Sequence, residues 1–125
     1  MAARKIGAVV VVSDDGKAIG LLTDRDVTLR VVAEGRAPER TTVEDVMSPS
    51  VTCLSLDATI ERATESMRDA GVRRLPIIDD QQHVIGLVSF DDIVLLLGME
   101  LGNLAAALFT RQSTVAENEP RLPGD

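Results

Sequence analysis

The chain contains the stretch Gly20-Leu21-Leu22-Thr23-Asp24-Arg25-Asp26-Val27, and 66 positions later it contains Gly86-Leu87-Val88-Ser89-Phe90-Asp91-Asp92-Ile93. A shared offset that runs without a gap back to Met1 indicates an internal duplication, which decides the architecture before any single motif does. The feature that recurs best is a hydroxyl residue followed three positions later by an aspartate. The same offset aligns further apolar positions: Ile6 with Val72, Val11 with Ile77, and Leu29 with Leu95.

The composition is that of one small globular domain whose two halves share a core. The chain has 125 residues, of which 45% are apolar and 26% charged, and halves this short bury too little surface to stand alone. The net charge is −7, and Phe90 and Phe109 are the only aromatic residues. Because nucleic-acid binding relies on basic side chains and aromatic stacking, we expect no nucleic-acid partner.

The sequence predicts a cytoplasmic protein that does not interact with membranes. Cys53 is the only cysteine and cannot form an internal disulfide, and no basic-then-apolar leader precedes the first strand-like run. The longest apolar stretch, residues 93–109, contains Glu100 and Asn103 and is too short to span a bilayer comfortably. We expect it to form a buried or partner-facing helix.

Local patterns predict the elements of both halves. In the first half, β-branched residues 8–12, the turn signal Asp14-Asp15-Gly16 and residues 18–23 indicate a hairpin, followed by a helix from Asp24 that Gly35 ends. The second half is more complete. It shows a short helix at 44–47, a break at Pro49, a strand at 51–54, a helix capped by Asp57 and ended by Gly71, strands at 75–79 and 84–89, and a last helix from Asp91 or Asp92.

These elements predict an α+β fold made of tandem β-α-β-β-α repeats. The first repeat lacks about two dozen residues that the second possesses, so either the sequence starts late or the protein keeps a reduced first unit. The expected organisation is a partial first repeat at 1–35, a linker at 36–42, a second repeat with an extended C-terminal helix at 43–109, and a mobile tail at 110–125.

The recurring hydroxyl and aspartate have two possible uses. Thr23 or Ser89 can donate to an anionic oxygen at a helix start, and Asp26 or Asp92 can accept two hydrogen bonds from a vicinal diol such as a ribose. Residues of these types also cap helices, and a duplicated cap would recur in the same way. The motif alone leaves both readings open.

Together with two upstream segments, the motif resembles the CBS domain, a module that occurs in tandem pairs. The segments are 71–79 (Gly-Val-Arg-Arg-Leu-Pro-Ile-Ile-Asp) and 45–52, which includes Met47-Ser48-Pro49. The resemblance covers residues 43 to about 97 as a full repeat and 1 to about 33 as part of another. It implies two repeats packed through their sheets, with two clefts that hold AMP, ADP, ATP or related adenosyl ligands.

Carried over residue by residue, the resemblance assigns roles in both clefts. In the second, Asp92 would hold the ribose, Ser89 a phosphate, and Arg73 or Arg74 further phosphates, while the adenine would lie against Val51, Thr52, Val72 and Pro76. In the first, Thr23 and Asp26 keep the motif and Arg25 or Lys5 would supply the positive charge. The first repeat has no counterpart of Val51 and Thr52, so we expect the second cleft to be the stronger site.

The sequence predicts neither catalysis nor a metal site. His83 is the only histidine and lies in a polar turn, and the acidic pairs Asp14-Asp15, Asp79-Asp80 and Asp91-Asp92 fall at turns or at a helix start. No nucleophile is paired with a base. We expect a protein that is not an enzyme and requires no cofactor.

Two functions from different classes remain. The first is a regulatory module that binds an adenosine-containing ligand, forms a homodimer and signals through changed packing to a separate effector protein. The alternative is a ligand-free dimerisation or assembly module. Its support is the row of apolar residues on the last predicted helix: Ile93, Leu96, Leu97, Leu101, Leu104 and Leu108.

Overall fold

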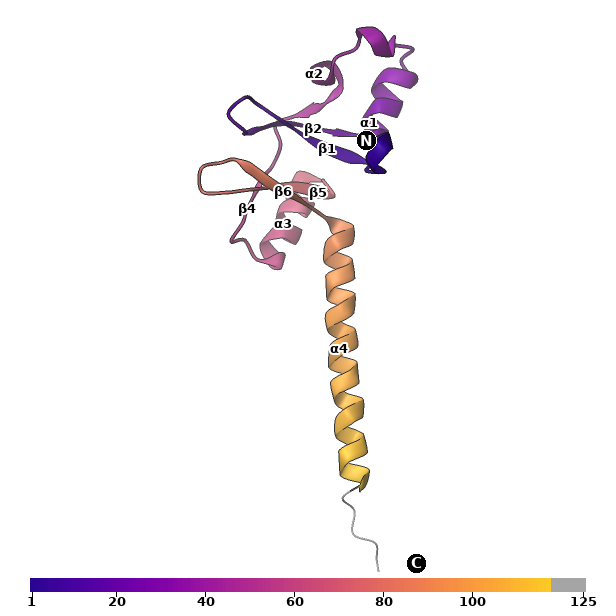
Figure 1. The fold of residues 1–125 in the computed structure, drawn as a ribbon, viewed down its shortest axis with the longest axis vertical. Coiled ribbons are helices and arrows are strands. Elements are labelled where there is room, and N and C mark those ends of the chain that lie inside the picture. The colour runs from indigo at the N-terminus through magenta and orange to yellow at the C-terminus, as the bar shows by residue number, and fades with distance from the viewer. Residues whose placement is uncertain (118–125) are drawn as a thin grey trace, which may run out of the picture. The chain divides into compact units, whose positions relative to one another are not determined.

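The computed structural model describes the backbone of residues 1–117 and the side chains of residues 1–110. The fold is α+β, as predicted, and the chain divides into two compact units, Met1–Phe90 and a second that begins at Asp91. The first unit contains two three-stranded sheets (Figure 1). In chain order the main elements are β1 (Ala8–Val12), β2 (Ala18–Thr23), α1 (Asp24–Val27), α2 (Val43–Val46), β3 (Ser48–Pro49), β4 (Leu54–Ser55), α3 (Ile60–Ala70), β5 (Arg74–Ile78), β6 (Val84–Ser89) and α4 (Phe90–Glu117).

The two predicted hairpins are present and match in detail. The β1–β2 pair aligns Ala8 with Thr23, and the β5–β6 pair aligns Arg74 with Ser89. Each hairpin shifts its register once, between Val11 and Val12 in the first and between Ile77 and Ile78 in the second, which are equivalent positions. The duplication therefore extends to an irregularity of the backbone.

The third strand of each sheet differs between the repeats. β3 pairs antiparallel with β2, whereas β4 pairs parallel with β5. The predicted strand at 51–54 was wrong in its bounds: residues 50–53 are not extended partners of any strand, and Ser50 has a left-handed backbone with φ 60°. The first sheet is thus completed by a strand from the segment that leads into the second repeat.

Helix α3 covers the second sheet. Its Ala63 and Met67 are buried, and Leu75 of β5 is 0% exposed. Gly71, with φ 65°, ends the helix as predicted, but the N-cap is Thr59 and not Asp57, because the Thr59 hydroxyl accepts from the Arg62 N–H. A buried cluster beside the first sheet consists of Leu22 and Val31 of the first repeat and Val46 of the second.

The tips of the two hairpins are joined by backbone pairing. Lys17 and His83 form an antiparallel bridge, and the Val84 N–H donates to the Gly16 carbonyl at 3.0 Å. The two hairpins consequently lie alongside each other in Figure 1. Because these bonds connect the repeats directly, the halves behave as one unit.

The helix after β2 is not a continuous α-helix. α1 has four residues and passes into a π-helical turn, Thr28–Val32, in which the Ala33 N–H donates to the Thr28 carbonyl at 2.9 Å. Gly35 follows with φ 64°, at the predicted end. Single π-helical turns of this kind occur frequently at functional sites.

Helix α4 is longer than the sequence analysis expected, since it continues past residue 109 to Glu117. Its segment Phe90–Thr110 is, by length and composition alone, sufficient to cross a bilayer, so the argument that this stretch is too short was wrong. Many of its apolar side chains are exposed, including Leu101 at 68%. Residues 118–125 of the predicted mobile tail lie outside the described residues.

Gly20 and Gly86 occupy equivalent positions but should differ in their tolerance of alanine. A Cβ on Gly20 would overlap the Met47 sulfur, whereas one on Gly86 would meet Ile77 at an ordinary 3.7 Å. We therefore expect Gly20→Ala to lower the free energy of unfolding by about 1–3 kcal/mol, as overpacking does, and Gly86→Ala to leave it nearly unchanged. Urea unfolding of both variants measures this; equal effects would contradict the assignment of Met47 as the obstacle.

Asp79 should contribute to the pH dependence of stability. Its carboxylate accepts the N–H groups of His83 at 2.8 Å and Gln81 at 2.9 Å, and these bonds hold its pKa below the ordinary value. A lowered native pKa stabilises the fold above the ordinary pKa of about 3.9, and this contribution is lost as the pH falls through the native pKa. Asp79→Asn should therefore show a smaller decrease in Tm than the wild type on acidification from about pH 5 to pH 3. An identical decrease in both proteins would remove Asp79 from the acid response.

Candidate functional site

A pocket of about 140 Å³ lies between the two repeats. Leu21 of β2 forms one wall, and Val72 and Arg74 of the second repeat form another. The segment that contains β3 runs between them. The pocket is smaller than the roughly 300–1,000 Å³ typical of sites that enclose a whole ligand, so a nucleotide-sized molecule would extend beyond it. The complete lining is Leu21, Ser48, Pro49, Ser50, Val51, Thr52, Ala70, Val72 and Arg74.

Four residues predicted for the second cleft therefore meet in this pocket: Val51, Thr52, Val72 and Arg74. The other five lining residues were not predicted from the sequence. Ser50 has a backbone conformation that is uncommon for a residue other than glycine, and such strained positions are enriched at binding sites. The lining is mainly apolar, with three hydroxyl groups and the guanidinium of Arg74 as its polar components.

Four predicted members of the second cleft are not among the lining residues: Arg73, Pro76, Ser89 and Asp92. Pro76 belongs to β5 and is fully buried, so it supports the sheet and does not line the pocket. The Arg73 guanidinium stacks over the ring of Phe90, 5.2 Å from its centroid. Arg74 is the arginine that lines the pocket, and which of the two arginines meets a phosphate stays a prediction.

Ser89 and Asp92 occupy the positions expected from the repeat. Ser89 is the last residue of β6 and is the cross-strand partner of Arg74, a lining residue. Asp92 follows three residues later, in the first turn of α4. The hydroxyl thus ends a strand and the aspartate begins a helix.

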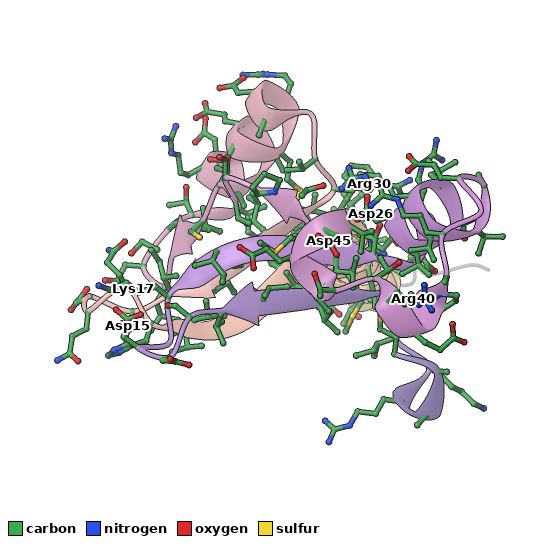
Figure 2. The ribbon with its side chains drawn as sticks, turned by 90° about the horizontal axis from the view of Figure 1, so that it is seen from above. Asp15, Lys17, Asp26, Arg30, Arg40 and Asp45 are labelled. Carbon is green, nitrogen blue, oxygen red and sulfur yellow. The ribbon has the colours of Figure 1, made fainter. Side chains whose placement is uncertain are left out.

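In the first repeat the same motif forms a helix cap. The Thr23 N–H and hydroxyl donate to Asp26 Oδ2 at 2.9 and 2.8 Å, and the Asp26 N–H donates to the Thr23 hydroxyl at 3.1 Å. Asp26 Oδ1 also lies 3.3 Å from the guanidinium of Arg30, as Figure 2 shows by the placement of the two side chains. In this repeat, the motif is observed to cap the helix.

The cation that pairs with Asp26 is Arg30, whereas the positive charge that Arg25 or Lys5 would supply to a ligand stays a prediction. Arg25 lies in α1, where its N–H donates to the Asp24 carboxylate, and Lys5 ends a short 3-10 turn with φ 52°. Arg30 was missed by the sequence analysis. Its position four residues after an aspartate is the usual spacing of an ion pair on a helix and could have identified it.

A third hydroxyl and aspartate pair shows that this geometry is a general helix start in the protein. The Thr42 N–H donates to Asp45 Oδ2 at 2.9 Å at the beginning of α2, and the Asp45 N–H donates to the Thr42 hydroxyl at 3.3 Å. The bond from the Thr42 N–H, together with a smaller contribution from the Thr42 side chain, lowers the pKa of Asp45. The motif by itself consequently does not identify a ligand site.

Cys53 directly follows the lining segment. Its thiol lies 3.7 Å from the Val51 carbonyl, and burial raises its pKa, so the thiol remains protonated near neutral pH. Among the described residues no cluster of three or more histidine, cysteine, aspartate or glutamate side chains could hold a metal ion.

Comparison with known proteins identifies the repeat. The CBS domain model matches residues 1–33 and 43–98. MK0525 of Methanopyrus kandleri is 39% identical over 89 residues, which are 71% of this chain and 45% of MK0525. The CBS domain-containing protein YhcV of Bacillus subtilis is 38% identical over 93 residues, 74% of this chain and 64% of YhcV. The chain thus spans less than two thirds of either relative.

Solved structures share the fold. The CBS domain pair of protein MJ0100, in complex with 5′-methylthioadenosine and S-adenosyl-L-methionine, superposes with a TM-score of 0.68. The match is 24% identical and covers 79% of this chain and 76% of MJ0100's. At this identity the likeness speaks for the fold alone. The family model nevertheless matches most of the sequence in two repeats, and this chain belongs to the CBS-domain family.

Proposed function

We propose that the chain is a non-catalytic regulatory module that binds an adenosine-containing ligand, of the AMP, ADP or ATP class, in the pocket between its repeats. The observation that carries this proposal is the joint lining of one pocket by Leu21 of the first repeat and by Val72 and Arg74 of the second. A ligand there contacts both halves at once. The CBS domain pair of MJ0100 holds adenosyl ligands, which makes the fold a suitable host for this chemistry.

The lining chemistry fits such a ligand. The apolar side chains of Leu21, Val51 and Val72 suit the faces of a planar base, and the hydroxyls of Ser48, Ser50 and Thr52 offer hydrogen bonds to its edge. Arg74 is the one charged residue of the lining, and its guanidinium matches the geometry of a phosphate or carboxylate group. Asp92 remains the predicted acceptor for the ribose hydroxyls.

Signalling would follow from the position of the pocket. Its walls belong to β2, to the segment 48–52 and to the second repeat, so a bound ligand favours the arrangement in which these walls close. A separate effector protein that binds this arrangement preferentially would then bind more tightly when the ligand is present. The response is then a shift of population and requires no chemical step.

Calorimetric titration with AMP, ADP, ATP and S-adenosylmethionine tests this function. Because hydrogen bonds to charged groups are strong, we expect Arg74→Met to weaken binding of the anionic ligands about ten-fold or more, and Asp92→Ala to weaken binding of all four. Arg62→Met is the matched control, since Arg62 is exposed on α3 and pairs with Glu65. Wild-type affinity in Arg74→Met would refute the assignment, as would the absence of binding by all four ligands to the folded wild type.

A second candidate function, homodimerisation, is favoured by one feature of α4. Exposed apolar residues follow one another at alternating spacings of three and four, which is the pattern of a two-stranded coiled coil. These residues are Val94, Leu97, Leu101, Leu104 and Leu108. We propose that this row pairs with the same row of a second copy, which is compatible with the sensor function.

Glutamate substitution of this row tests the dimer. Leu101→Glu and Leu104→Glu should convert a dimer into a monomer in light scattering coupled to size-exclusion chromatography, because the charge would be buried in the pair. Met99→Glu is the matched control, since Met99 is exposed on the same helix outside the row. A monomeric wild type would contradict the proposal. Co-flotation of the wild type with lipid vesicles would assign the helix to a bilayer instead.

A further inference from the structure

Arg30 connects the motif aspartate of the first repeat to the segment that lines the pocket. Its guanidinium lies 3.3 Å from Asp26 Oδ1, and it donates to the Val46 carbonyl at 2.7 Å and to the Ser48 hydroxyl at 3.1 Å. Figure 2 shows the pair of Asp26 and Arg30 on one side of the first unit. One side chain thus joins an aspartate four residues before it to two groups that lie 16 and 18 positions after it.

Asp26 is occupied by protein donors. Oδ2 accepts both the N–H and the hydroxyl of Thr23, Oδ1 faces Arg30, and the side chain is only 15% exposed. A ribose diol would need to displace these donors before Asp26 could accept its two hydrogen bonds. The carboxylate is therefore placed to orient Arg30 and not to receive a ligand.

The other two partners of Arg30 lie in the segment that lines the pocket or directly before it. Val46 is 4% exposed and packs with Leu22 and Val31 in a buried cluster, and Ser48 lines the pocket. Two residues later comes Ser50, whose left-handed backbone persists only where the surroundings hold it. Arg30 itself lies in the π-helical turn, the irregular part of the helix after β2.

We propose that Asp26 and Arg30 form a positioning pair for the pocket between the repeats. The pair holds the segment 46–50 in the conformation that lines the pocket, so the motif aspartate of the first repeat acts on the second cleft through Arg30 and binds no ribose of its own. One chain then binds one adenosyl ligand. The effect on binding rests on the proposed function, whereas the effect on the segment does not.

Two readouts on the variants Asp26→Asn and Arg30→Met test the pair. Hydrogen exchange without ligand should show faster exchange of the amides in residues 46–50 in both variants. Titration with AMP, ATP and S-adenosylmethionine should show affinity about three- to thirty-fold weaker, with an unchanged stoichiometry of one. Asparagine still accepts the Thr23 N–H, so Asp26→Asn keeps the helix cap. The double variant should be no weaker than either single one, because the residues act together.

Arg36→Met is the matched control, because Arg36 forms an exposed ion pair with Glu34 that does not reach the pocket segment. It should match the wild type in both readouts. Arg30→Lys should behave like Arg30→Met, since an ammonium group lacks the fork that reaches both Val46 and Ser48. This variant keeps the positive charge beside Asp26. It therefore distinguishes the loss of the hydrogen bonds to the segment from the loss of the charge.

Two results would contradict the proposal that Asp26 and Arg30 position the segment. Unchanged exchange of residues 46–50 in both single variants would show that the contacts do not hold the segment. A wild-type stoichiometry of two that Asp26→Asn reduces to one would show that Asp26 binds a ligand directly. If the wild type binds none of the ligands, the proposed function fails, and the exchange measurement still decides whether Asp26 and Arg30 hold the segment.

Discussion

The pairing of β3 with β2 is the interaction on which the candidate site depends. Only Ser48 and Pro49 take part, opposite Leu21 and Gly20, yet this short pairing attaches the beginning of the second repeat to the sheet of the first. Gly20 permits it, because Met47 approaches the position where any other residue would carry its Cβ. The segment after β3 then passes along the pocket. Without this attachment, Leu21 and Val72 would not line the same pocket.

The residue opposite the motif hydroxyl differs between the two repeats: Thr23 lies opposite Ala8, whereas Ser89 lies opposite Arg74. In the first repeat, Thr23 and Asp26 cap the helix through mutual hydrogen bonds, and Asp26 also pairs with Arg30. In the second, Ser89 is the cross-strand neighbour of a pocket residue. The duplication thus produced two copies of the same hydroxyl and aspartate motif.

Much of the fold could be predicted from the sequence because it depends on local pairing. Both hairpins follow from β-branched runs separated by turn residues, and the end of α3 follows from Gly71, which adopts the left-handed conformation there. β3 could not be predicted, since two residues that include a proline carry no strand pattern. The N-cap of α3 was misassigned because Asp57 and Thr59 are both suitable types, and only the observed bond to the Arg62 N–H distinguishes them.

By itself, the sequence determined the duplication, the two hairpins, the resemblance to the CBS domain and four of the residues that meet in the pocket. Only the tertiary structure decided that Arg74 and not Arg73 lines it, and that Asp26 is held by Arg30. The physical reason is how far apart in the sequence the contacting residues lie. A cap joins residues three apart, whereas Arg30 contacts groups 16 and 18 positions away and the pocket brings Leu21 to Val72. Such contacts exist only once the repeats have packed together.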